Sequence, residues 1–377
     1  MKYMKVKDLF KIIKGKKVEQ VYKPKENTVR FIQIDDLRND KNIKFCERKE
    51  EYIFASKNDL IIAWDGANAG TIGYGLEGAI GSTLAILRTN SNDVFIPYLG
   101  RFLQSKSKYL RDTCTGATIP HISKKVLEEI KIPIPSYEKQ IELSKILDKA
   151  QELIDKRKAQ IEALDQLTQS VFLEMFGDLR TQRNGWKIVE LSDVVQIDAN
   201  LVDDITNYVN YPLVGIDNIE KNTGNLINIK TVGESDVKGS KYFFSKEHIL
   251  YSKIRPYLNK VASPCFEGLC STDAYPLKIN NEKAKKQFIL NILRSKDFVN
   301  YAVKHSKGAN IPRIDQKQLL KYKIILPDSK TQNRFEYIVE KIEIQKEKMK
   351  KSLRELEYTF NSLMQRAFKG ELLKNDE

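Results

Sequence analysis

The chain has 377 residues, of which 41% are hydrophobic and 30% are charged, a balance typical of a folded globular protein that excludes a wholly disordered one. Lys and Arg number 64 against 50 Asp and Glu, a formal net charge of +14. This surplus favours a polyanionic partner such as nucleic acid, although a lysine-rich solubilising surface would give the same value. No apolar leader opens the chain and no apolar run approaches about 18 residues, so we expect a cytoplasmic protein without membrane association. Four scattered cysteines and three histidines show no metal-ligand spacing, so we expect no metal and no cofactor.

The first part of the chain, residues 1–136, is rich in short apolar segments separated by glycine-containing turns. The segments Phe31–Ile34, Leu60–Trp64 and Leu84–Leu87 predict strands. Apolar residues recur at helical spacing between Pro97 and Arg111, which predicts a helix there. We therefore expect residues 1–136 to form a β-rich module.

A heptad pattern follows over residues 137–180. Apolar residues alternate in steps of four and three, with interruptions at Arg157 and Thr168. The pattern predicts one helix of about 60 Å. Its predicted seam includes Leu147, Ile154, Ile161 and Leu164.

The rest of the chain repeats this order, with a second module over residues 181–328 and a second heptad helix over residues 329–377. The repeat is strongest 192 positions apart, where Gly116, Ala117, Ile119, Pro120 and Ile122 return as Gly308, Ala309, Ile311, Pro312 and Ile314. The seam of the second helix includes Val339, Ile342, Leu353 and Leu356, and only Lys346 is polar. A repeat of this length indicates two copies of one domain-plus-helix unit.

Two apolar stripes of equal length and register predict that the helices pack on each other as an intramolecular coiled coil. A single stripe would also suit the buried face of a helix in a bundle. A pseudo-twofold relation between the modules requires antiparallel helices. A parallel pair would require the second module to span the whole rod backwards. We therefore expect an α+β protein with two similar β-rich domains and an antiparallel coiled coil.

The sequence shows no catalytic constellation. Gly73–Gly78 matches the G-x-G-x-x-G spacing of a dinucleotide-binding turn, but a strand-like segment follows it where a helix is required, so hairpin turns explain the glycines. No phosphate-binding loop of the GxxxxGK[ST] type occurs. We therefore expect that any catalytic activity is supplied by partner proteins.

Each module ends in G-A-x-I-P-x-I, then K-I-x-I/L-P, then a glutamine at the start of the heptad helix, as in Thr115–Ile122 and Ile130–Gln140. This arrangement resembles the specificity subunit of type I restriction–modification enzymes over essentially the whole chain. The resemblance implies that each module is a target-recognition domain reading one half of a split double-stranded DNA sequence. It implies that the helices act as a ruler and as the dock for methyltransferase subunits, two in number, which restriction and translocase subunits join. Family members often carry Glu-Gln at the start of the helix, where this chain has Glu138-Lys139-Gln140 and Lys330-Thr331-Gln332. The second copy lacks the acid, so no role is assigned to it.

Direct readout of DNA requires polar and basic side chains on exposed loops. Two loops of each module fit this need: 64–71 and the segment ending at His121 in the first, and 253–260 and the segment ending at Arg313 in the second. The candidate DNA-binding residues are Trp64, Asn68, Thr71, Thr118, His121, Lys253, Arg255, Tyr257, Lys260, Lys307, Asn310 and Arg313. Ordinary turns and a packed surface ring at Tyr257 are the structural alternatives.

The leading hypothesis is therefore a non-catalytic subunit that reads DNA and assembles partner enzymes. An enzyme with unrecognised motifs would cut or methylate DNA alone. A coiled-coil tether with incidental basic charge would show no specific DNA binding.

Overall fold

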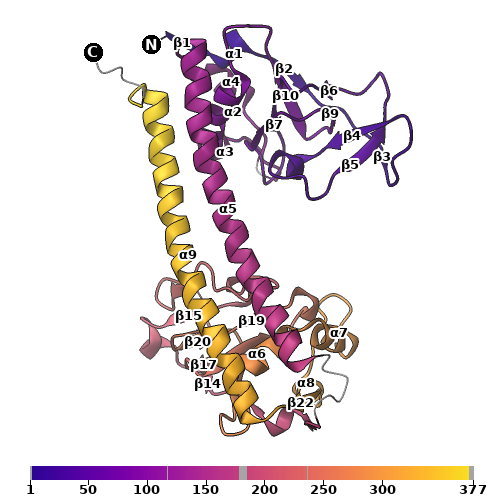
Figure 1. Ribbon diagram of the computed structural model, residues 1–377, viewed down its shortest axis with the longest axis vertical. Coiled ribbons are helices and arrows are strands. Elements are labelled where there is room, and N and C mark those ends of the chain that lie inside the picture. Colours follow the sequence, from indigo (N-terminus) through magenta and orange to yellow (C-terminus); the bar gives the residue numbers. More distant parts are fainter. Residues whose placement is uncertain (1, 117, 178–184, 236, 373–377) are drawn as a thin grey trace. The chain divides into compact units, whose positions relative to one another are not determined.

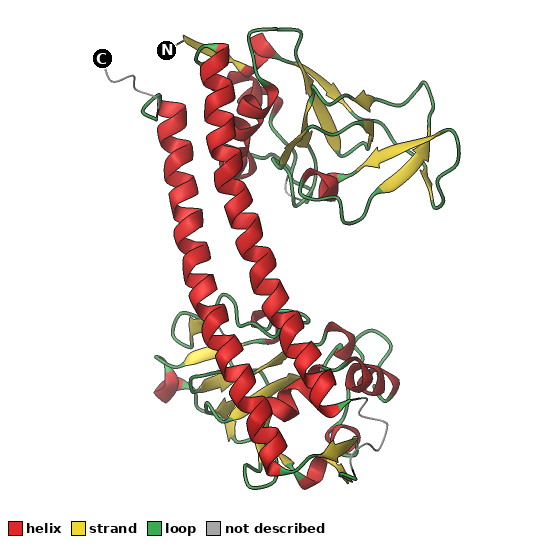
Figure 2. Cartoon of the chain, in the orientation of Figure 1, coloured by secondary structure: helices red, strands yellow, loops and turns green. Residues whose placement is uncertain are grey.

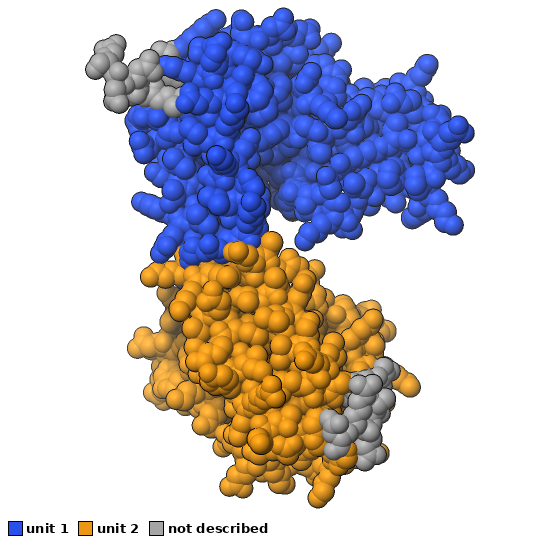
Figure 3. Space-filling model, viewed as in Figure 1, with its two compact units in different colours: residues 1–157, 352–377 blue, residues 158–351 orange. Residues whose placement is uncertain are grey.

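The computed structural model describes residues 2–116, 118–177, 185–235 and 237–372. The chain divides into two compact units, one of Met1–Arg157 with Ser352–Glu377 and one of Lys158–Lys351 (Figure 3). The long helices α5 (Tyr137–Phe176) and α9 (Ser329–Lys369) each contribute residues to both units (Figure 1). The expected domain boundaries at 136 and 328 lie directly before these helices, whereas the boundary at 180 lies outside the described residues.

Unit 1 contains the first module, whose strands form three sheets. They are β1 (Lys2–Lys5) with β11 (Lys131–Ile134); β2 (Lys11–Lys14), β10 (Leu84–Arg88), β7 (Leu60–Ala63) and β8 (Ile72–Tyr74); and β3 (Gln20–Val21), β5 (Lys44–Glu47), β4 (Thr28–Ile32), β9 (Gly78–Ile80) and β6 (Phe54–Ala55), each given in spatial order. The helices of this module are α1 (Val6–Leu9), α2 (Ile96–Ser105), α3 (Ser107–Asp112) and α4 (Lys124–Glu129). The predicted strands at Leu60–Trp64 and Leu84–Leu87 correspond to β7 and β10. The predicted strand Phe31–Ile34 overlaps β4 only at Phe31 and Ile32, because a short 3-10 helix begins at Ile34.

Unit 2 repeats the three sheets (Figure 2). They are β12 (Lys187–Glu190) with β22 (Lys323–Leu326); β13 (Val195–Ile197), β21 (Ala274–Ile279), β18 (His248–Ser252) and β19 (Val261–Ala262); and β14 (Leu201–Val202), β17 (Lys241–Phe244), β20 (Gly268–Cys270), β15 (Pro212–Val214) and β16 (Lys230–Thr231). Its helices include α6 (Lys286–Arg294), α7 (Lys296–Lys304) and α8 (Gln316–Leu320).

The five-stranded sheets share a four-stranded core, and the fifth strand is added at opposite edges of that core in the two units. In each, one strand pair is parallel, β4 with β9 and β15 with β20, and the remaining pairs are antiparallel. The outer strand beyond this core is β3, next to β5, in unit 1, but β14, next to β17, in unit 2. The two modules therefore have one framework with different additions.

The helix predicted over Pro97–Arg111 is two helices, α2 and α3, separated at Lys106. Unit 2 has the same break at Ser295, between α6 and α7. There the Ser295 hydroxyl accepts a hydrogen bond from the Phe298 N–H at 3.2 Å and caps the second helix. The prediction of one helix was wrong. Apolar residues keep their helical spacing across the break, so the spacing alone does not reveal it.

The helices α5 and α9 are antiparallel within each unit. In unit 2, Phe172 and Phe176, near the end of α5, contact Phe335, near the start of α9, with ring centroids 5.5 and 5.2 Å apart. In unit 1, Leu143 and the end of α9 share one apolar core, where the Phe368 ring lies 5.1 Å from that of Phe102. These contacts confirm the antiparallel expectation and the mixed α and β fold.

The predicted seam residues lie on the packed side of both helices. Leu147, Ile154, Val339 and Ile342 are buried, and Ile161, Leu164, Leu353 and Leu356 are half-buried. Lys346, the polar member of the stripe, is buried as well and forms an ion pair with Asp165 of α5. A buried ammonium requires such a partner, because desolvation of an unpaired charge is costly.

A buried glutamine joins each module to the start of its long helix. In unit 1, the Gln140 side-chain oxygen accepts from the Phe95 N–H at 2.8 Å, and its amide donates to the Asp93 and Pro135 carbonyls, both at 3.0 Å. In unit 2, Gln332 accepts from the Lys285 N–H at 2.8 Å and donates to the Lys283 and Pro327 carbonyls at 3.3 and 2.8 Å. Each glutamine thus satisfies three backbone groups of two separate segments.

Replacing Gln332 by Leu is expected to lower the free energy of unfolding by about 3 kcal/mol or more, because buried backbone groups lose their partners. Urea denaturation measures the change. The matched control is Gln345→Leu, which alters an exposed glutamine of the same helix and should shift stability by less than about 0.5 kcal/mol. Equal urea midpoints of unfolding for the two variants would contradict this stabilising role of Gln332.

Candidate nucleic-acid interface

The two candidate loops of the first module lie side by side, which the sequence did not predict. Loop 64–71 follows β7, and residues 115–122 form a small hairpin against it. Four backbone hydrogen bonds hold them: His121 N–H to the Thr115 carbonyl (2.7 Å), Thr115 N–H to His121 (2.9 Å), Gly66 N–H to Pro120 (2.9 Å) and Ile122 N–H to Trp64 (2.9 Å).

The second module repeats this construction with loop 253–260 and hairpin 307–314. Its four bonds are Arg313 N–H to the Lys307 carbonyl (2.8 Å), Lys307 N–H to Arg313 (2.9 Å), Arg255 N–H to Pro312 (2.7 Å) and Ile314 N–H to Lys253 (3.0 Å). We call these two assemblies, 64–71 with 115–122 and 253–260 with 307–314, the paired loops. They place every candidate DNA-binding residue of one module on a single assembly.

One glycine in each hairpin is required by its backbone. Gly116 has a φ of +96° and Gly308 a φ of +109°, a conformation that side-chain-bearing residues rarely adopt. A Cβ would also lie 2.5 Å from the Ile119 oxygen in the first hairpin and 2.7 Å from the Ile311 oxygen in the second. The shared glycines therefore serve the turn itself.

In unit 1 the candidate side chains form a polar cluster. The Asn68 side-chain oxygen accepts from the Arg38 guanidinium at 2.6 Å, and the Thr71 hydroxyl donates to the Asn68 carbonyl at 2.8 Å. Trp64 is half-buried, with the Lys14 ammonium 6.0 Å from its ring centroid, and Thr118 is exposed on the hairpin. Sequence reasoning missed Arg38 and Lys14, because both come from elements distant in sequence from the paired loops.

His121 is exposed and held by an acid. Its Nδ1 lies 2.6 Å from an oxygen of Asp65, and the other oxygen of Asp65 lies 3.1 Å from the Lys14 ammonium. Asp65 therefore bridges the loop, the hairpin and strand β2.

In unit 2, some of the candidate DNA-binding side chains are exposed and others are held by contacts within the protein. Arg255 and Tyr257 are exposed, and Arg255 adopts a left-handed conformation with a φ of +49°. Lys253 is half-buried, with its ammonium 5.6 Å from the Tyr275 ring centroid. Lys260 is largely buried and donates to the Ile216 carbonyl at 2.8 Å. Lys260 therefore holds the loop in this structure, and its side chain does not project from the surface.

The exposed hairpin of unit 2 presents Lys307, Asn310 and Arg313. Asp273 lies beneath it, 4.0 Å from the Arg313 guanidinium and 3.9 Å from the Lys253 ammonium. An acid between two basic side chains recurs here as in unit 1, although Asp273 comes from the turn before β21 and Asp65 from the loop after β7.

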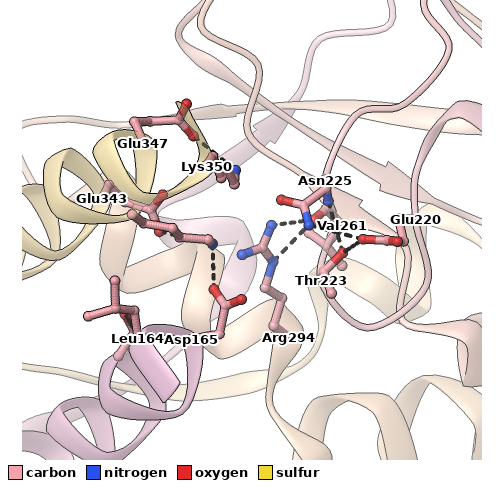
Figure 4. A network of polar contacts seen from close by, with 12 residues as sticks. Leu164, Asp165, Glu220, Thr223, Asn225, Val261, Arg294, Glu343, Glu347 and Lys350 are labelled. Carbon is pink, nitrogen blue, oxygen red and sulfur yellow. Dashed lines mark hydrogen bonds and ion pairs between the residues drawn. The ribbon is translucent and has the colours of Figure 1, made fainter. Parts of the chain in front are cut away.

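A half-buried arginine fixes the end of the loop in unit 2 (Figure 4). The Arg294 guanidinium donates to the Val261 carbonyl at 3.1 and 2.8 Å, and the Arg294 carbonyl accepts from the Asn259 side-chain amide at 2.9 Å. Burial lowers the pKa of Arg294 to about 10, which Glu343 and Asp165 of the long helices partly oppose. In unit 1, Gln104 donates to the Ile72 carbonyl at 3.1 Å in the corresponding place.

A second set of contacts in Figure 4 orders the neighbouring turn. Glu220 accepts from the Thr223 hydroxyl and, at 3.0 Å, from the Asn225 side-chain amide, and these hydrogen bonds lower its pKa. Asn222 in the same turn donates its N–H to the Leu258 carbonyl at 3.2 Å. The paired loops of unit 2 thus rest on ordered backbone.

No group of three or more His, Cys, Asp or Glu side chains that could hold a metal occurs among the described residues. Within the same residues, no helix is both long and apolar enough to cross a bilayer.

Comparison with known families identifies a match over most of the chain. The family described as "Type I restriction modification DNA specificity domain" matches residues 1–164 and 183–358. The repeat seen in the sequence is therefore also a repeat of this family's domain.

Individual relatives agree with the match. The chain is 30% identical over 209 residues to the type I restriction enzyme MjaVIII specificity subunit of Methanocaldococcus jannaschii, covering 52% of this chain and 49% of that protein. It is 26% identical over 313 residues to the type I restriction enzyme EcoDI specificity subunit of Escherichia coli, covering 73% of this chain and 70% of that protein. The alignment with the first relative thus spans about half of that relative's length.

The fold also matches a solved structure. The S subunit of a type I restriction-modification system from M. genitalium aligns with a TM-score of 0.55 and 15% identity, covering 97% of this chain and 96% of that one. The likeness shows the fold alone.

Replacing Gly308 by Ala is expected to open the second hairpin, because the new Cβ meets the Ile311 oxygen in a strained backbone conformation. Faster hydrogen exchange of the amides in residues 307–314 measures the opening. Gly239→Ala is the control, since Gly239 also has a positive φ but has open space around it. Unchanged protection at the Arg313 amide would contradict the predicted role of Gly308.

Proposed function

The chain belongs to the type I restriction modification DNA specificity family, and we propose that it is the non-catalytic DNA-binding subunit of a type I restriction–modification enzyme. Each module is a target-recognition domain that reads one block of a split double-stranded DNA target. Methyl transfer and cleavage are supplied by partner subunits. We assign these domains to residues 1–136 and 181–328, and the spacer helices to residues 137–180 and 329–377. Since the substrate is DNA, we place the assembly in the cytoplasm.

The observation that carries the proposal is the pair of equivalent loop assemblies. Their backbones are held by the same four hydrogen bonds, yet their exposed side chains differ, as at Thr118 and Asn310 or His121 and Arg313. A fixed framework with variable polar tips is suited to direct readout of base edges. The formal charge of +14 favours the accompanying phosphate contacts.

The long helices support a second role, in assembly. Several apolar side chains of these helices are exposed: Leu153, Leu167, Leu173, Tyr337 and Tyr358. In unit 2, an apolar groove of about 430 Å³ lies between the helices beside Val171, Ile338 and Ile342. Exposed apolar surface on a charged helix pair is typical of a protein-binding site. We assign it to methyltransferase subunits, two per chain because the unit is repeated, with restriction subunits joining that complex.

The helices also supply the spacing between the two blocks in this proposal. α5 has 40 residues and α9 has 41, each without a break. A continuous helix of this length extends for about 60 Å. We therefore propose a fixed unread spacer between two short specific sequences.

Replacing Arg255 and Lys307 together by Ala is expected to weaken binding of the whole methyltransferase complex to duplex DNA. For every phosphate that the variant no longer neutralises, the slope of log affinity against log salt should fall by about 0.9. The control is Lys323→Ala, an exposed lysine on β22 away from the paired loops. Identical salt slopes for the double variant and the control would show that Arg255 and Lys307 do not contact DNA phosphates.

The direct test is co-expression of the chain with the methyltransferase subunit of its own organism in a methylation-free host, followed by sequencing of the modified bases. We expect a split motif with a fixed gap. Exchange of one module for that of another specificity subunit should change one half of the motif only. A soluble complex that leaves DNA unmodified would overturn the proposal and favour a coiled-coil tether.

A further inference from the structure

The paired loops put one residue of each unit in the same place. His121 in unit 1 and Arg313 in unit 2 both close their hairpin by a two-way backbone exchange, with Thr115 and Lys307 respectively. Each is followed by a buried isoleucine, Ile122 or Ile314. The two side chains therefore start from equivalent backbone positions, and both are exposed.

Residues common to both hairpins cannot account for a difference in what the two units read. Gly116 and Gly308 are required by backbone conformation, and the two isoleucines fill the core. The described positions that differ are 115 and 307, 118 and 310, and 121 and 313. Of these, only 121 and 313 carry a side chain that an acid from outside the hairpin contacts.

That acid comes from a different element in each unit. Asp65 lies in the loop after β7 and approaches His121 at 2.6 Å, whereas Asp273 lies in the turn before β21 and approaches Arg313 at 4.0 Å. Each acid also contacts a lysine ammonium, that of Lys14 at 3.1 Å or that of Lys253 at 3.9 Å. The two units thus place an acid beside equivalent positions from different elements. The backbone framework that the units share does not explain this similarity.

We propose that positions 121 and 313 are the specificity-determining positions of the two units, each reading one base pair of its half-site from the major groove. This inference rests on the proposed function and adds to it which residues discriminate. Asp65 and Asp273 are positioning residues that orient the reading side chain.

The two side chains offer different hydrogen-bond patterns. Arg313 presents parallel N–H donors, which match the O6 and N7 acceptors of guanine. His121 engages Asp65 through Nδ1, so one ring nitrogen, Nε2, is left for a base edge. We expect a guanine opposite Arg313 and a less strictly defined base opposite His121.

The test exchanges the two side chains in the intact complex with the methyltransferase, using Arg313→His and His121→Arg. The readout is the methylated motif, compared with that of the wild-type complex. Arg313→His should lower discrimination at one base pair of the second half-site by about tenfold or more. His121→Arg should introduce a preference for guanine at one base pair of the first. Each variant should leave the other half-site unchanged.

Lys323→His is the matched control, because it removes an exposed cation of unit 2 outside the paired loops. Asp273→Asn should repeat the effect of Arg313→His in weaker form at the same base pair. Unchanged motifs in both exchange variants, with a normal wild-type motif, would overturn this inference while leaving the proposed function intact. The inference would also be overturned if the exchange variants only lost overall methylation, to the same extent as Lys323→His, without a change of motif. A wild-type complex without any split motif would instead overturn the proposed function.

Discussion

The arrangement of each module depends on one buried glutamine at the start of its long helix. Gln140 and Gln332 each bond three backbone groups, drawn from the segment before α2 or α6 and from the end of β11 or β22. An apolar side chain of similar size would fill the space but leave those groups unpaired. Each glutamine therefore ties the segment before α2 or α6, and the end of β11 or β22, to the first turn of the long helix.

The two units differ in the side chains that hold the loops. Unit 2 anchors its loop with the half-buried guanidinium of Arg294 and with the Asn259 side chain. Unit 1 uses the neutral Gln104 at the corresponding place. A partly buried charge is stable here because the Val261 carbonyl oxygen accepts two of its donors and helix carboxylates lie nearby. The same scaffold thus tolerates different interior chemistry while it presents the same backbone at the surface.

Sequence reasoning located the candidate loops but not their partners. Shared glycines and prolines mark the hairpin of each paired loop, whereas loops 64–71 and 253–260 share neither residue type and correspond only by their position after β7 and β18. The repeat gave no sign that the segments lie against each other, because the bonds that join them run between backbone groups. It also ranked Lys260 with Arg255, although one side chain is engaged with the Ile216 carbonyl and the other is exposed. Arg38 was missed because only folding brings it to Asn68.

Taken alone, the sequence determined the repeat, the two heptad helices, the seam from Leu147 to Leu356 and the family resemblance. These features are periodic or local, so spacing along the chain is sufficient to reveal them. The tertiary structure decided the break between α2 and α3, the joining of each loop to its hairpin and the placement of an acid beside His121 and Arg313. Those features depend on contacts between residues far apart in sequence, which no one-dimensional pattern encodes.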